Sequence, residues 1–396
     1  MKRFFVGFVF DSEKEIELLA NSRIGVQTAA NQYQLGFITG LCDSSLEILS
    51  SLSVGAFPRL NKKLFYKNDT VSRDYGRINY LDFVNLPVLR EAAFEKKIYK
   101  TLSKSIKNAE NDGIEVYFYS LYIPFLNVLK RLKKKFGDRF HACLIIPDLP
   151  GKYGIMRKKT SLRGIKDRLE VRKKMSYPNF ANSFVFLTDP MKELFDEKPY
   201  TVIEGFLPNC KFNYDNKRES KTVLYTGSLN PAFGITTLLK AFESIKDPDY
   251  RLWICGAGDG QGDVEAAAAR DNRIIYKGFL PKSEIADLQT RCDVLINPRP
   301  ADGEYTKYSF PSKTMEYLLS GSKVVMHRLD GIGDEYYKFI RVIDEHTPEA
   351  IAKAIATACE DGDFYNSRFM EQVEWIMESK SSSNQVKKYM ENLYEA

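Results

Sequence analysis

Short apolar runs alternate with longer amphipathic runs along the second half of the chain. Except for a short piece at 335–339, each amphipathic run extends over about 10 to 15 residues, the length of a crossover helix, and the apolar runs are rich in Val, Ile and Leu. The pattern predicts strands at residues 222–229, 250–258, 273–279, 293–299, 323–329 and 340–344, and helices at 234–246, 262–271, 282–292, 311–321, 335–339 and 347–359. Strands and helices that alternate in this way form a parallel sheet with helices on both faces. The second half is therefore expected to be a doubly wound α/β domain.

The first half alternates less regularly but has the same character. Its apolar runs predict strands at 3–10, 46–54, 115–121, 141–147, 182–188 and 200–204, with helices between them and a less regular insertion around 57–90. Residues 206–220 are polar and include Pro208 and Asn209, which is typical of a linker. Beyond residue 364 we expect two amphipathic helices, broken near 381–383.

At 396 residues the chain is longer than one hydrophobic core usually supports. We predict a Rossmann-like N-terminal domain over residues 1–207, a Rossmann-like C-terminal domain over 208–370, and a C-terminal helix within 371–396 that packs back on the first domain. Ligands of doubly wound domains bind outside the carboxyl ends of the strands. The expected site is therefore a central cleft that both domains face.

Composition narrows the class of protein further. The six cysteines form no Cys-x-x-Cys pair and the three histidines are far apart in the sequence, so no metal site, disulfide framework or cofactor is expected. The first residues are interpreted as a strand and not as a signal peptide, and no run reaches the roughly 18 apolar residues of a spanning helix. These features predict a cytoplasmic protein.

Positive charge is concentrated before residue 175. The net charge is only +6, but basic runs occupy 130–136, 157–166 and 168–174. Two interpretations stay open: solvated helix faces, or attraction to an anionic membrane surface, which would make the protein peripheral on the inner face of the plasma membrane. No nucleic-acid motif accompanies the charge, so nucleic acid is not an expected partner.

The most informative segment is 295–326, in which a strand leads through a long loop into a helix that starts at Pro311 and Ser312. The free amides at a helix start and the helix dipole suit a diphosphate, and Lys313 adds a positive charge in the first turn. Glu316 follows one turn later, close to the same face. The segment therefore predicts an anion site with an adjacent carboxylate.

This segment resembles the family 4 glycosyltransferases, in which a Glu-x7-Glu motif is followed by a helix and an Ala-Ser-Gly-x-Pro-Val turn. Glu316 and the LLSGSKVV that follows match the second half of this motif. The resemblance implies the GT-B fold, with Glu316 accepting hydrogen bonds from the ribose hydroxyls of a nucleotide. The first glutamate of the motif falls at Tyr308, so contacts to the donor sugar would pass to the backbone amides of Ser309 and Phe310.

A second segment, 225–234, is similar to the family's loop Gly-Arg-Leu-x-x-x-Lys-Gly. Gly227 stands at the glycine, Ser228 at the arginine and Phe233 at the lysine, so two cations that would meet the diphosphate are absent. Arg299, which ends the strand at 293–299, is the predicted replacement because a guanidinium grips phosphate oxygens bidentately. The alternative for Arg299 is a surface salt bridge.

A third segment, 276–288, is similar to the family's Gly-x-[Leu/Val]-x-x-x-Glu-Leu, whose backbone meets the nucleobase. The resemblance assigns Gly278, Phe279 and Leu280 to the base. Phe279 is alternatively a core residue.

The first half resembles the family mainly in layout. Residues 22–41 are similar to the family's first loop and helix, which approach donor and acceptor, and Gly25 and Asn31 are the candidate residues there. Asp148 follows the strand at 141–147 and is the candidate for positioning an acceptor hydroxyl. It could equally cap a turn before Pro150.

The resemblance implies a retaining glycosyltransferase that moves a sugar from a nucleoside-diphosphate sugar, with UDP as the expected nucleotide, to a saccharide or lipid-linked saccharide in bacterial polysaccharide biosynthesis. The leaving diphosphate would help to deprotonate the acceptor, and Ser312, Lys313 and Arg299 would stabilise it without a metal. Asp-x-Asp sequences at 247–249 and 361–363 are interpreted as polar turns. Two alternatives stay open: a nucleotide-sugar epimerase of the same architecture, and a non-catalytic glycosyltransferase-like partner.

Overall fold

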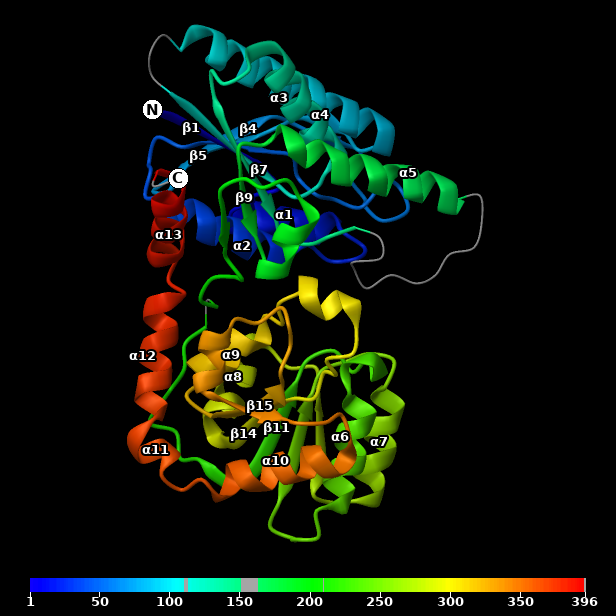
Figure 1. Cartoon of the computed structure of the whole chain (residues 1–396). Coiled ribbons are helices and arrows are strands. Elements are labelled where there is room, and N and C mark those ends of the chain that lie inside the picture. Colours follow the sequence, from blue (N-terminus) through cyan, green and yellow to red (C-terminus); the bar gives the residue numbers. More distant parts are fainter. Residues whose placement is uncertain (110–112, 151–162, 209, 395–396) are drawn as a thin grey trace. The chain divides into compact units, whose positions relative to one another are not determined.

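The computed structural model describes the chain except residues 110–112, 151–162, 209 and 395–396. The chain forms two compact units (Figure 1): the first unit is Met1–Phe206 together with Ser382–Ala396, and the second unit is Leu207–Ser381. The predicted C-terminal segment began at residue 371. In the structure only its last helix, after Ser381, belongs to the first unit, and the helix before it belongs to the second.

The first unit contains an eight-stranded sheet with the order β10-β9-β8-β7-β1-β2-β5-β4. Its strands are β1 Lys2–Gly7, β2 Glu47–Ser50, β4 Asp69–Arg73, β5 Gly76–Tyr80, β7 Ile114–Tyr119, β8 His141–Ile146, β9 Ser183–Phe186 and β10 Tyr200–Val202. The helices are α1 Ser12–Asn21, α2 Thr28–Gly40, α3 Pro87–Asn108, α4 Ile123–Phe136, α5 Arg163–Ser176 and α13 Ser382–Tyr394, with short 3-10 helices η2 Tyr177–Phe180 and η3 Asp189–Leu194. The six strands predicted for this half are confirmed, and each ends before its predicted last residue.

The insertion around 57–90 is more regular than predicted. Besides the short pair β3 Phe65–Tyr66 and β6 Phe83–Val84, it contributes the hairpin β4–β5, and β5 pairs with β2 in parallel. Gly76 adopts φ +133 in this hairpin, where an added Cβ would lie 2.6 Å from the Leu46 carbonyl oxygen, so the turn needs a glycine. The strands escape hydrophobic pattern analysis because β4 is mostly polar and exposed.

The last helix, α13, is an integral part of the first unit. Tyr389 is 1% exposed, and its ring centroid lies 5.8 Å from that of Phe37 and 6.1 Å from that of Tyr117. Gly40 at the end of α2 allows the helix to approach closely, because a Cβ there would lie 2.2 Å from the carbonyl oxygen of Ser382. The first unit is therefore complete only with a segment that follows the second unit in the sequence.

The second unit is a six-stranded parallel sheet with the order β13-β12-β11-β14-β15-β16. Its strands are β11 Glu219–Thr226, β12 Arg251–Cys255, β13 Ile274–Gly278, β14 Cys292–Asn297, β15 Lys323–His327 and β16 Ile340–Ile343. The helices are η4 Pro231–Phe233, α6 Ile235–Ser244, α7 Gln261–Arg270, α8 Lys282–Arg291, η5 Glu304–Tyr308, α9 Lys313–Leu319, η6 Asp334–Lys338, α10 Pro348–Glu360, α11 Phe364–Ser367 and α12 Phe369–Ser379. The predicted doubly wound domain is confirmed.

Helices cover both faces of this sheet. Alternate strand residues such as Val223 and Ile254 join one core with buried residues of α6, α7 and α10. In Figure 1, α6 and α7 lie together on one side of the strands and α8 and α9 on the other.

The order of the strands fixes where a ligand can bind in the second unit. From β11 the chain moves outward to β12 and β13, then returns to the other side of β11 at β14. The carboxyl ends of β11 and β14 are therefore the topological switch point, and ligands of doubly wound domains bind at such points.

Candidate functional site

The end of β11 is held in place by a buried tyrosine of α9. The Tyr317 hydroxyl accepts a hydrogen bond from the Thr226 amide at 3.0 Å and donates one to the Thr226 carbonyl oxygen at 3.1 Å. Burial raises the pKa of Tyr317, so the hydroxyl stays protonated. These bonds fix the loop that begins at Gly227 and Ser228 relative to the segment that carries Lys313. Ser228 itself is exposed, and its carbonyl oxygen accepts a bond from Tyr225.

Arg299 lies at the other side of the switch point, just after β14. The residue is only 9% exposed, and its Nη2 donates to the Ser309 hydroxyl at 2.9 Å. Its Nε–H is buried and has no hydrogen-bond partner in the described part of the chain. Within the described residues no carboxylate forms an ion pair with it, so the alternative of a surface salt bridge is wrong. A buried guanidinium without a counter-ion is costly, and an anionic ligand would relieve that cost.

Two aromatic rings flank the guanidinium. Its carbon lies 5.4 Å from the centroid of Phe233 and 4.7 Å from that of Tyr305. Gly234 brings the start of α6 against this strand end, because it adopts φ +82 and a Cβ there would lie 2.2 Å from the Pro298 carbonyl oxygen. The ring that stands at the expected lysine position thus contacts the arginine that we expect to replace that lysine.

Lys313 and Glu316 lie on one face of α9, as the sequence predicts. The Lys313 ammonium donates to both carboxylate oxygens of Glu316, at 2.8 and 2.9 Å. Gln289 on α8 donates from Nε2 to Glu316 Oε1 at 2.9 Å. Burial and the nearby Glu316 raise the pKa of the Cys210 thiol to about 11, which keeps this thiol neutral beside the carboxylate. Glu316 is thus a partly exposed carboxylate whose donors come from two helices.

The loop that leads into α9 packs its side chains inward. Tyr308 and Phe310 are 8% and 9% exposed, and the ring centroid of Phe310 lies 5.4 Å from that of Tyr336. The Ser309 hydroxyl donates to the Tyr305 carbonyl oxygen at 2.9 Å, while Pro311 accepts a bond from the Thr314 amide at 2.8 Å. Ser312 is exposed directly before the helix. The roles of these backbone amides stay predictions.

Phe279 is 84% exposed, so the alternative of a core residue is wrong. It follows Gly278, which adopts φ +71 and whose carbonyl oxygen accepts a bond from the Gly256 amide at 2.9 Å. Leu280 is half-buried. The end of β13 therefore presents a bare aromatic ring from a glycine-hinged turn, at the same edge of the sheet as Arg299 and Glu316.

Two of the three histidines, which looked dispersed in the sequence, are in contact. His327 Nε2 lies 3.1 Å from His346 Nδ1, and the outer nitrogens bond the Ile343 carbonyl oxygen at 3.2 Å and the Thr237 hydroxyl at 3.1 Å. Burial, then the neighbouring His346, lower the pKa of His327 to about 4. The sequence pattern could have predicted this contact, because His327 ends β15 and His346 closely follows β16, the adjacent parallel strand.

In the first unit, Asn31 is 6% exposed and both ends of its amide are used on the backbone of Phe10, at 2.9 and 2.8 Å. It fixes the loop after β1. Gly25 adopts φ +79, and its carbonyl oxygen accepts a bond from Ser22 at 2.6 Å. Asp148 follows β8 and is an exposed residue. Desolvation of its carboxyl by neighbouring atoms nevertheless raises the pKa of this group, and the positive charge of Lys174 opposes the effect.

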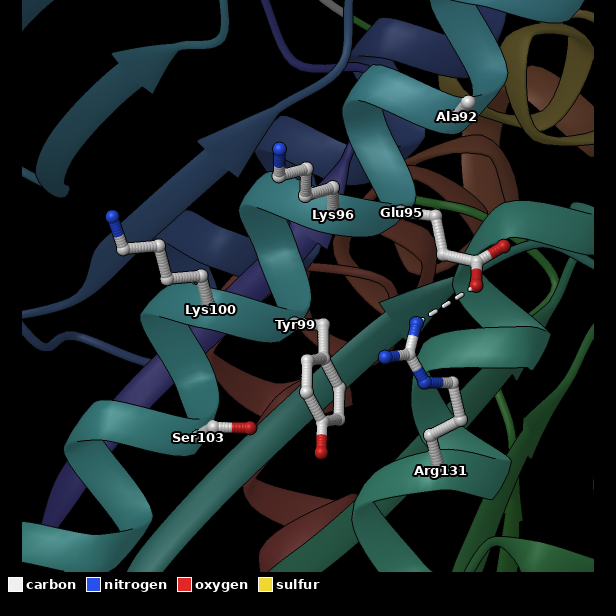
Figure 2. Close-up of a pocket in the computed structure, with 7 residues that line it drawn as sticks. All are labelled: Ala92, Glu95, Lys96, Tyr99, Lys100, Ser103 and Arg131. Atoms are coloured by element: carbon white, nitrogen blue, oxygen red, sulfur yellow. Dashed lines mark hydrogen bonds and ion pairs between the residues drawn. The ribbon is translucent and has the colours of Figure 1, made fainter.

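The basic run 130–136 lies on α4, whereas most of 157–166 lies outside the described residues. A hollow of about 580 Å³ is lined by residues of α3 and α4. Figure 2 shows Glu95 and Tyr99 of α3 turned toward Arg131 of α4, which pairs with Glu95 at 3.0 Å and lies 4.0 Å from the Tyr99 ring centroid. Across the described residues, no helix has the length and apolarity needed to span a bilayer.

The two Asp-x-Asp sequences take part in surface ion pairs. Asp247 pairs with Lys221 at 2.6 Å and Asp361 with Arg368 at 2.6 Å, and both turns follow helices, as predicted. Among the described residues no three His, Cys, Asp or Glu side chains gather so that they could hold a metal ion.

The second unit matches the family model of the glycosyl transferases group 1 over residues 220–361. D-inositol 3-phosphate glycosyltransferase of Corynebacterium glutamicum (strain R) is 29% identical over 155 residues, 36% of this chain and 36% of that protein. 2-deoxystreptamine glucosyltransferase of Streptomyces kanamyceticus is 29% identical over 89 residues, 22% and 21% of the two chains. The matches thus span about a fifth to a third of these relatives.

Solved structures are similar over the whole chain. Anabaena Alr3699/HepE in complex with UDP has a TM-score of 0.63 at 16% identity, with 100% of both chains covered. TarM has a TM-score of 0.61 at 11% identity over 99% of both chains. The catalytic domain of starch synthase IV from Arabidopsis thaliana, bound to ADP and acarbose, has a TM-score of 0.59 at 10% identity, over 100% of this chain and 99% of that one. These likenesses show the GT-B fold.

Proposed function

Because the second unit matches the family model of the glycosyl transferases group 1 and the chain is similar to solved GT-B structures, we propose that it transfers a sugar from a nucleoside-diphosphate sugar to a saccharide or lipid-linked saccharide acceptor. One observation carries the proposal. Arg299 is a buried cation at the switch point of the second unit that has no counter-ion among the described residues, and a diphosphate supplies the missing charge.

The donor would be held through three contacts. Arg299 and Lys313 bind the diphosphate. Glu316 accepts hydrogen bonds from the ribose hydroxyls, and these bonds replace the two that Glu316 accepts from Lys313 in the free protein. The exposed ring of Phe279 and the backbone of Gly278 and Leu280 meet the base. UDP is the proposed nucleotide, supported by the UDP that Alr3699/HepE binds.

The proposed reaction retains the configuration of the sugar. The two cations stabilise the charge that develops on the departing diphosphate, and this diphosphate takes the proton of the acceptor hydroxyl. The proposal assigns this stabilisation to side chains of the chain and not to a metal. Asp148 of the first unit, with its raised pKa, is proposed to orient the acceptor hydroxyl.

No specific observation favours either of the two alternatives, a nucleotide-sugar epimerase or a non-catalytic partner. An epimerase needs acid and base groups that act on the sugar, and the histidine pair is already occupied by Ile343 and Thr237. A non-catalytic partner would not need a buried guanidinium without a counter-ion.

Nucleotide binding tests the proposal directly. We expect UDP to raise the melting temperature more than GDP or dTDP does, with or without EDTA, and the gain to disappear in Glu316→Ala. Glu374→Ala, which removes an exposed carboxylate of α12, is the matched control and should keep the gain. Absence of stabilisation by all three nucleotides would favour the non-catalytic partner, and a gain that EDTA abolishes would show that a metal is needed.

We also propose that the basic surface formed by α3 and α4 contacts an anionic membrane on the inner face of the plasma membrane, in bacterial polysaccharide assembly. Lys96 and Lys100 extend from α3 at the hollow of Figure 2, and Lys134 and Lys135 are exposed on α4. Each basic residue near such a surface contributes about 1 kcal/mol.

Vesicle flotation tests this surface. The wild type should float with phosphatidylglycerol vesicles and not with phosphatidylcholine, and Lys96→Glu with Lys100→Glu should reduce flotation. The control, Lys240→Glu with Lys353→Glu, reverses two exposed charges of the second unit. Equal flotation with both lipids would leave the solvated-face interpretation.

A further inference from the structure

Gln289 is a fully buried polar side chain beside the proposed ribose site. It is 0% exposed on α8, and its Nε2 donates to Glu316 Oε1 at 2.9 Å. Its Oε1 is buried, and none of the residues that the structure describes donates a hydrogen bond to it. An unpartnered carbonyl oxygen in the core destabilises the fold, and an apolar side chain of similar volume would avoid it. Its amide makes one side-chain bond, and that bond goes to Glu316.

The backbone of Gln289 is anchored as firmly as its side chain. Its carbonyl oxygen accepts a hydrogen bond from the Ser322 hydroxyl at 2.6 Å and one from the Cys292 thiol at 3.4 Å. Both partners are fully buried, so the backbone position from which the amide side chain extends is fixed. A hydrogen-bond donor on a fixed backbone holds the carboxylate that it bonds in one orientation.

The other donor to Glu316 is different in kind. Lys313 bonds both carboxylate oxygens, but its side chain is 36% exposed and flexible. If Lys313 turns to a diphosphate, Gln289 is the donor that remains on Oε1, and Oε2 is left to accept.

We propose that Gln289 is a positioning residue, which holds Oε1 of Glu316 so that Oε2 accepts the ribose hydroxyls and Lys313 is released to the diphosphate. This inference rests on the proposed function of Glu316. It extends that function to a residue outside the motifs that carry the family resemblance.

Ribose analogues separate positioning from mere packing. We expect Gln289→Met to weaken UDP binding about fivefold to tenfold, the effect of one hydrogen bond, and to change the binding of 2′,3′-dideoxy-UDP by less than about twofold. Isothermal titration calorimetry measures each affinity.

Gln372→Met is the matched control. Gln372 is also 0% exposed with an unpartnered Oε1, but its Nε2 donates to the carbonyl oxygens of Leu318 and Ser322 and not to a carboxylate. It should alter stability and leave the ratio of UDP to dideoxy-UDP affinity at the wild-type value.

Gln289→Glu provides a second test with a readout that packing does not affect. It keeps the shape of the side chain but sets two carboxylates together, and only a proton shared between them restores the bond. Its UDP affinity, relative to the wild type, should therefore rise as the pH falls from 8 to 5.

The outcomes distinguish the two proposals. Equal losses for UDP and dideoxy-UDP in Gln289→Met, or a pH profile of Gln289→Glu parallel to the wild type, would overturn the role of Gln289. If Glu316→Ala still abolished UDP binding, the proposed function would stand. A wild-type protein that bound no nucleotide would overturn both.

Discussion

Replacement of Arg299 by methionine tests the donor site most directly, because it affects the free protein and the nucleotide complex in different ways. In the free protein the change removes a charge-assisted bond to Ser309, about 1.5–3 kcal/mol, and two ring contacts of about 0.5–1 kcal/mol each. The change also removes a buried Nε–H that has no acceptor among the described residues, which stabilises the fold by about 1–3 kcal/mol. It further stabilises the fold because an unpaired charge is no longer buried. The terms oppose each other, so we expect the melting temperature to change by no more than about 4 °C.

The nucleotide complex has no such compensation. Each charged hydrogen bond between the guanidinium and a phosphate contributes about 1.5–3 kcal/mol, so the loss of one weakens UDP binding roughly 10-fold to 150-fold. Uridine, which has no phosphate, should bind Arg299→Met within about twofold of the wild type. Calorimetric titration with UDP, UMP and uridine gives the three affinities.

The control is Arg291→Met, which removes an exposed guanidinium that pairs with Glu219 and Asp287. Its effect on UDP should be negligible. Two results would refute the reasoning: UDP affinity unchanged in Arg299→Met, or an equal loss for uridine and UDP, which would mean that the substitution merely distorts the site.

Three further predictions follow from the described contacts. Phe279→Ala should leave the melting temperature unchanged, since the ring is 84% exposed, and weaken UDP binding at least about fivefold through lost stacking; unchanged affinity by calorimetry would contradict the base contact. In the folded state the pKa of His327 is lowered from 6.5 to about 4, so the folded protein keeps this imidazole neutral. Its contribution to the free energy of unfolding, about 3 kcal/mol, is therefore complete above pH 6.5 and is lost as the pH falls toward 4. Urea titrations should show this slope in the wild type and a flatter one in His327→Gln. Residues 207–381, expressed alone, should fold cooperatively and bind UDP. Residues 1–206 should fold only when a peptide of residues 382–394 is added, and circular dichroism follows the folding of both fragments.

The second unit could be predicted almost element by element because its strands are continuous apolar runs. Val223, Leu224, Val294 and Leu295 are buried whichever face they point to, as in any parallel sheet covered on both sides. The hairpin β4–β5 could not be predicted in this way, since a mostly exposed edge strand carries no hydrophobic signature.

The candidate site was predictable only where one short segment holds its parts. Lys313 and Glu316 are three residues apart on a helix, and their contact follows from helical geometry. The surroundings of Arg299 are different: Phe233 and Tyr305 come from two separate loops, and their approach depends on the packing of α6 against Pro298. The sequence predicts only that Gln289 lies on a helix, since its contact with Glu316 depends on the position of α9.

The return of α13 to the first unit has a consequence for the order of synthesis. Phe37 and Tyr117 pack against Tyr389, which leaves the ribosome only after all residues of the second unit. Domains usually fold in the order in which they emerge from the ribosome. Here the first unit emerges first, but its aromatic surface stays uncovered while the second unit is synthesised and folds. The nascent first unit is therefore a natural client for a chaperone that shields apolar surface, and slow translation of residues 207–381 would prolong its exposure.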